Sequence, residues 1–69
     1  MEINETLKDA LILKYQGDIA TAKANISVYL TSPVGIGEHP DLISAIDTEM
    51  EKAAEADDNL CFLENEVDW

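Results

Sequence analysis

Apolar residues recur at alternating steps of three and four residues in two long segments of this 69-residue chain. In a helix, such steps place all the residues concerned on one stripe, as in the seam of a coiled coil. In the first segment, about residues 4–31, the stripe passes through Ile12, Tyr15, Ile19, Ala22, Ile26 and Tyr29. Leu7, Leu11 and Leu30 widen it toward the breadth of a core-facing helix.

The second segment, about residues 40–66, repeats the pattern. Its stripe passes through Leu42 or Ile43 and then Ile46, Met50, Ala53, Ala56, Leu60, Leu63 and Val67. Pro40 suits the first position of a helix, because the N–H that proline lacks would have no partner there. Asp41 follows in the first turn, where its charge complements the helix dipole.

Residues 32–39 separate the two segments and predict a turn. Pro33 disfavours helical geometry in the preceding residue, which ends the first helix. We expect an ordered turn with a positive φ at one of its two glycines. Its structural residues are Pro33, Gly35, Gly37, His39 and Pro40. The chain is thus expected to be one all-α domain over residues 1–69, an antiparallel two-helix hairpin.

Gly17 leaves one alternative open in the first helix. A glycine costs about 1 kcal/mol relative to alanine inside a helix, and Asp18 after it could cap a new helix. The stripe nevertheless passes Gly17 without a change of phase. We therefore expect one continuous helix, in which Gly17 marks a kink or a close approach to another helix.

Charge excludes several classes of function. The chain has four lysines, no arginine and 15 acidic residues, for a net charge of −11. Direct binding to nucleic acid or to an anionic membrane is therefore not expected. No apolar run approaches the roughly 18 residues of a membrane span, and the N-terminal residues lack a signal-peptide pattern. A single cysteine, Cys61, cannot form an internal disulfide. These features indicate a cytoplasmic protein.

No constellation of residues predicts catalysis. His39 lies in the turn and Cys61 far along the second helix, about 30 Å away at the rise of a helix, so the two cannot form a nucleophile–base pair within one chain. The Gly35–Gly37 segment lacks the preceding strand and third glycine of a phosphate-binding fingerprint. His39 and the neighbouring carboxylates offer too few converging ligands to predict a metal site. We expect a non-enzyme with no catalytic, cofactor or metal site.

The acidic residues are unevenly distributed. Residues 1–37 carry four carboxylates and three lysines, whereas residues 38–69 carry eleven carboxylates and one lysine. The plain interpretation is a solvated helix face. The sharper hypothesis is a surface for a basic partner, formed by Glu51, Glu55, Asp58 and Glu66. A runner-up is a DNA mimic that inhibits a nucleic-acid-binding protein.

Further apolar residues predict self-association. Leu13, Val28 and Phe62 fit neither stripe, and a hairpin of this length has only one internal interface. Two hairpins would form a four-helix bundle, a homo-oligomer with the nearly neutral first helices inside and the acidic second helices outside. Within each hairpin we expect Ile19, Ile26 and Ile46 to be buried.

The segment Thr31-Ser32-Pro33-Val34-Gly35-Ile36-Gly37-Glu38-His39-Pro40-Asp41-Leu42, followed by Ala45-Ile46-Asp47, resembles a segment in small uncharacterised proteins of T4-like tailed phages, including those that infect marine cyanobacteria. The likeness covers roughly residues 25–60. It implies a phage-encoded accessory protein made in the host cytoplasm. It transfers no catalytic or binding residue.

Overall fold

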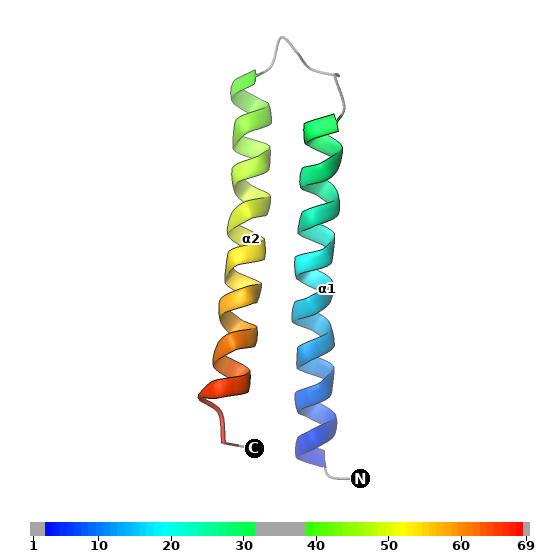
Figure 1. Ribbon diagram of the computed structural model, residues 1–69, viewed down its shortest axis with the longest axis vertical. Helices are drawn as coiled ribbons and strands as arrows, with labels where there is room; N and C mark the ends of the chain where they lie inside the picture. The colour runs from blue at the N-terminus through cyan, green and yellow to red at the C-terminus, as the bar shows by residue number, and fades with distance from the viewer. Residues whose placement is uncertain (1–2, 32–38, 69) are drawn as a thin grey trace.

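Two antiparallel α-helices make up the part of the chain that the structure describes (Figure 1). The computed structural model describes residues 3–31 and 39–68. Its helices are α1, Ile3–Thr31, and α2, His39–Asn65, and no strand occurs in these two ranges. The prediction of an all-α two-helix hairpin is confirmed. Each helix begins one residue earlier than expected and α2 ends one residue sooner, which is the usual uncertainty of helix ends.

The predicted turn falls largely outside the described residues. Pro33, Gly35 and Gly37 belong to residues 32–38, so the expectation of a positive φ there stays a prediction. His39 was expected in the turn but is the first residue of α2, and Pro40 follows it inside the helix. Asp41 lies in the first turn of α2, as its charge favours.

Gly17 does not break α1. The helix is continuous from Ile3 to Thr31, so the alternative with a second start at Asp18 is wrong. Gly17 is exposed, and no atom lies within 4 Å of the position that a Cβ would occupy. The glycine therefore makes no close approach to α2.

The core of the hairpin is a narrow seam of small and medium side chains. Ala22 of α1 and Ala56 and Leu63 of α2 are its buried apolar residues. The other predicted seam residues of α1 are half-buried, namely Ile12, Tyr15, Ile19, Ile26 and Tyr29. Their counterparts on α2 are also half-buried, namely Leu42, Ile46, Ala53 and Leu60.

Several predicted core residues lie further out than expected. Ile19, Ile26 and Ile46 are half-buried rather than buried, because a second helix covers only one side of each side chain. Leu11 is half-buried, whereas Leu7 and Leu30 are exposed, so the stripe of α1 is narrower than predicted. Of the two alternatives at the start of the α2 seam, Leu42 is half-buried and Ile43 is exposed, and Glu49 is buried where Met50 was expected. Val67 lies beyond the end of α2 and is exposed.

The molecule is a thin rod. Its principal extents are 53 × 19 × 11 Å, and its radius of gyration is 15.9 Å. A compact domain of this length would have a radius of gyration of about 11 Å. The accessible surface is 5302 Å², against about 4,300 Å² for a compact monomer of the same mass. The hairpin therefore exposes roughly 1,000 Å² more than a compact fold would.

Candidate functional site

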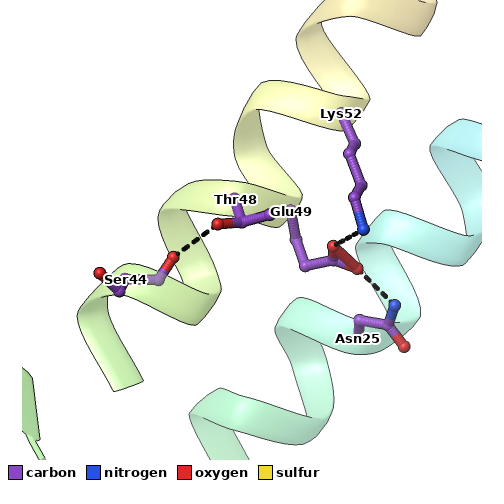
Figure 2. Close-up of polar contacts among 5 residues, drawn as sticks. All are labelled: Asn25, Ser44, Thr48, Glu49 and Lys52. Carbon is purple, nitrogen blue, oxygen red and sulfur yellow. Dashed lines mark hydrogen bonds and ion pairs between the residues drawn. The ribbon is translucent and has the colours of Figure 1, made fainter. Parts of the chain in front are cut away.

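A polar contact crosses the apolar seam between the helices. Glu49 of α2 points toward α1, where its Oε1 accepts a hydrogen bond from Nδ2 of Asn25 (Figure 2). Its Oε2 lies 3.0 Å from Nζ of Lys52, one turn further along α2. Glu49 is 5% exposed, whereas Lys52 extends into solvent. Both carboxylate oxygens are thus bonded, which offsets the cost of removing a charge from water.

These two bonds shift the ionisation of Glu49. The hydrogen bond from Asn25, followed by the one from Lys52, favours the carboxylate and holds the pKa of Glu49 below its ordinary value. Burial acts in the opposite direction but more weakly. The group is therefore charged in the folded hairpin at neutral pH. A single polar residue in an apolar seam also favours one register of the two helices, because other registers leave it unpaired.

The lowered pKa of Glu49 predicts a specific dependence of stability on pH. Because its pKa is lower in the folded chain, its contribution is present above the ordinary pKa and is lost as pH falls through the folded value. Glu49→Gln removes this titration. We expect wild type to exceed Glu49→Gln in free energy of unfolding near pH 7, and the difference to shrink toward about pH 3. Urea titrations followed by circular dichroism measure both values.

Glu51→Gln is the matched control for that comparison. It removes the same charge from an exposed position on the same helix, so it also corrects for the general repulsion in this acidic chain. The difference in free energy of unfolding between Glu51→Gln and wild type should change much less with pH. Equal pH dependence of the two variants would contradict the role given to Glu49.

A shallow groove lies along the side of the hairpin next to this contact. Its volume is about 370 Å³, and Asn25, Glu49 and Lys52 line it together with Lys14, Asp18 and Asn59. Lys14 forms an ion pair with Asp18 at 2.9 Å, and its Nζ lies 5.5 Å from the centre of the Tyr15 ring. The Asp18 carboxylate raises the pKa of Lys14 above its ordinary value. Both lysines of the groove are therefore paired with carboxylates.

Three of the four predicted acidic residues are exposed on α2. Glu51, Glu55 and Asp58 are exposed and follow one another at steps of four and three residues along α2. Glu55 also lines the groove beside α1, where its charge helps to raise the pKa of Lys14. Asp41 and Asp47 are also exposed, nearer the N-terminal end of α2. We define these five residues as the acidic surface. Glu66 is not part of it, because it lies just past α2, with its backbone N–H bonded to the carbonyl oxygen of Phe62 at 2.8 Å.

Cys61 and His39, the other residues considered for catalysis or metal binding, lie at opposite ends of α2. Cys61 is exposed on α2, where Nδ2 of Asn65 donates to its backbone oxygen at 2.8 Å. His39 lies at the opposite end of that helix. Among the described residues, no three His, Cys, Asp or Glu side chains are grouped so that they could hold a metal ion. No helix in this part of the chain has the length and apolarity needed to cross a membrane.

Sequence reasoning missed the contact between Asn25 and Glu49, although the spacing contains a sign of it. The predicted stripe ran from Ile46 to Met50, Ala53 and Ala56, with steps of four, three and three. Strict alternation of four and three requires Glu49 after Ile46 instead. The apolar residue was preferred to the charged one, and only the facing Asn25 explains why a carboxylate fits there.

Comparison with protein-family models, with characterised proteins and with solved structures found no significant match for this chain.

Proposed function

We propose that this chain is a small non-catalytic interaction protein that binds a basic protein through the acidic surface of α2. The supporting observation is that the lysine of α2 does not neutralise the carboxylates of that surface. Its five carboxylates are exposed on α2, and the only lysine of α2, Lys52, is bonded to Glu49 instead. A group of exposed carboxylates attracts a complementary basic surface and speeds the encounter with it.

The proposal includes self-association into a four-helix assembly. The hairpin buries only three apolar side chains among the described residues and leaves large apolar residues such as Leu13, Val28 and Phe62 exposed. A second hairpin would cover part of this surface without any lengthening of the chain. The resemblance of residues 31–47 to proteins of tailed phages fits an accessory role in the cytoplasm of an infected bacterium.

Binding to a basic partner predicts a clear dependence on the acidic surface. The variant Asp47→Asn, Glu51→Gln, Glu55→Gln, Asp58→Asn removes four of its five charges. Immobilised wild type should retain basic proteins from a bacterial lysate at about 50 mM salt, and this variant should lose them. Band intensities on a gel, with mass spectrometry to identify each band, measure the effect.

A second variant controls for net charge. Glu5→Gln, Asp9→Asn, Glu64→Gln, Glu66→Gln removes four exposed charges outside the acidic surface. It should retain the same proteins as wild type at the same salt concentration. If both variants lose them equally, the attraction is due to net charge alone and the proposed surface is wrong.

The row of carboxylates also supports a second candidate, a DNA mimic. Asp47, Glu51 and Glu55 follow one another at steps of four residues along a straight rod, as phosphates follow a DNA strand. In that case the retained protein is a nucleic-acid-binding protein, double-stranded DNA displaces it, and its binding falls steeply between about 50 and 300 mM salt. Retention that resists both DNA and salt favours an ordinary interaction protein.

A further inference from the structure

The side of α1 that faces away from α2 is apolar and nearly uncharged. Three large side chains lie on it, namely Ile3, Leu13 and Val28, with 60 to 75% of each residue exposed. We call this side the outer face of α1. Its charged neighbours lie at its edges, with Asp9 on one side and the Lys14–Asp18 ion pair on the other, whereas the outward side of α2 carries a row of carboxylates. The two outward sides of the hairpin therefore differ sharply in charge.

This difference restricts how two copies can meet. Each copy carries a net charge of −11, so any contact that includes the outward side of α2 opposes rows of carboxylates. The outer face of α1 reduces that repulsion, because a second outer face brings apolar and small side chains at its centre and has charges only at its edges. A strongly basic partner has no carboxylates to bind on this face. The charge pattern thus favours a second copy as its occupant.

The exposed area also fits a second copy. The hairpin exposes roughly 1,000 Å² more than a compact fold of its mass. A stable interface of standard size buries about 800 Å² on each partner. The excess belongs to the whole hairpin, and an interface of standard size would remove an area of the same order from solvent.

We propose that the outer face of α1 is the contact between two copies of this chain, with the two α1 helices antiparallel and Gly17 beside Gly17 of the other copy. This inference rests on the self-association in the proposed function and specifies its surface. Gly17 is the midpoint of α1, and the space where its Cβ would lie is empty, so another helix can approach closely there. An antiparallel pair also separates the two Lys14 side chains along the axis, whereas a parallel pair places them at the same level.

Cysteine cross-linking tests the arrangement directly. In a Cys61→Ser background, Gly17→Cys should form a disulfide-linked dimer on mild oxidation, because a disulfide needs Cα atoms within about 7 Å. Ala10→Cys alone should not form one, whereas a mixture of Ala10→Cys and Ala24→Cys chains should, since these positions lie equally far from Gly17 on either side. Absence of a link at Gly17, or efficient linking by Ala10→Cys alone, would overturn the proposed geometry.

Sedimentation equilibrium of charged variants separates the face from self-association itself. Leu13→Glu should weaken the dimer by about tenfold or more, because each copy then brings a carboxylate into an apolar contact. Phe62→Glu is the matched control, since it makes the same kind of change at an exposed apolar residue of α2. It should leave the dimer nearly unchanged, and circular dichroism should show equal helix content in both.

Each result of that comparison has a distinct meaning. If wild type is a dimer and Phe62→Glu dissociates it while Leu13→Glu does not, the assigned face is wrong but self-association stands. If wild type is a monomer, self-association itself fails and the inference fails with it. Binding of basic proteins by the acidic surface is measured separately and is unaffected by either outcome.

Discussion

Leu63→Ala is expected to remove about 2–5 kcal/mol from the free energy of unfolding, the usual cost of truncating a buried leucine. Leu63 is 6% exposed and is the largest of the buried apolar residues in the described part of the chain. A domain of this length has a total stability of about 3–10 kcal/mol. The variant should therefore be largely unfolded under conditions in which wild type is folded. Urea titrations at one protein concentration, followed by circular dichroism, measure the loss.

The preceding residue supplies the control. Phe62 is also large and apolar, but 62% of it is exposed. Phe62→Ala should cost about 1 kcal/mol or less, because little of the side chain leaves water on folding. A similar loss for both variants would show that α2 is rotated relative to the seam described above.

The two helices were predictable because the sequence repeats one physical pattern. Steps of three and four residues identify the stripe of each helix, and on α1 every predicted seam position from Ile12 to Tyr29 faces α2. Gly17 did not interrupt the helix, since its cost of about 1 kcal/mol is small beside the stripe that continues through it.

The depth of burial was less predictable. Ile19, Ile26 and Ile46 have the apolarity and spacing of core residues, yet the thin hairpin leaves each of them half-exposed. Spacing shows which side of a helix meets its neighbour, but not how many neighbours it has. Full burial of these side chains needs a further layer of structure, which one chain of this length does not supply.

The polar contact across the seam could not be predicted, because it joins two residues that are far apart in the sequence. Glu49 and Asn25 are 24 positions apart, and glutamate and asparagine are residue types that are seldom fully buried. The exposure of Glu51, Glu55 and Asp58 was easier to predict, because they belong to one charged run on one helix, whereas Asp41 and Asp47 were not assigned to the predicted face. Glu66 was assigned to the same surface because the second helix was expected to run to about residue 66, but α2 ends at Asn65.

Self-association is the second large effect expected for this chain. Each chain carries a net charge of −11, so two copies repel each other and this repulsion opposes pairing. Added salt screens exposed charges while it leaves the burial of apolar surface intact. The dimer should therefore become tighter as salt rises from about 50 to about 300 mM. Contacts held together by surface ion pairs would respond in the opposite direction.

Sedimentation equilibrium of the wild-type chain at tens of micromolar tests the central claim most directly, namely that the hairpin is completed by a second copy. At moderate salt the mass should be close to twice the 7.6 kDa of one chain, with a tighter association than at low salt. Circular dichroism of the same samples should show a folded helical protein. A folded monomer of 7.6 kDa at both salt concentrations would contradict the account.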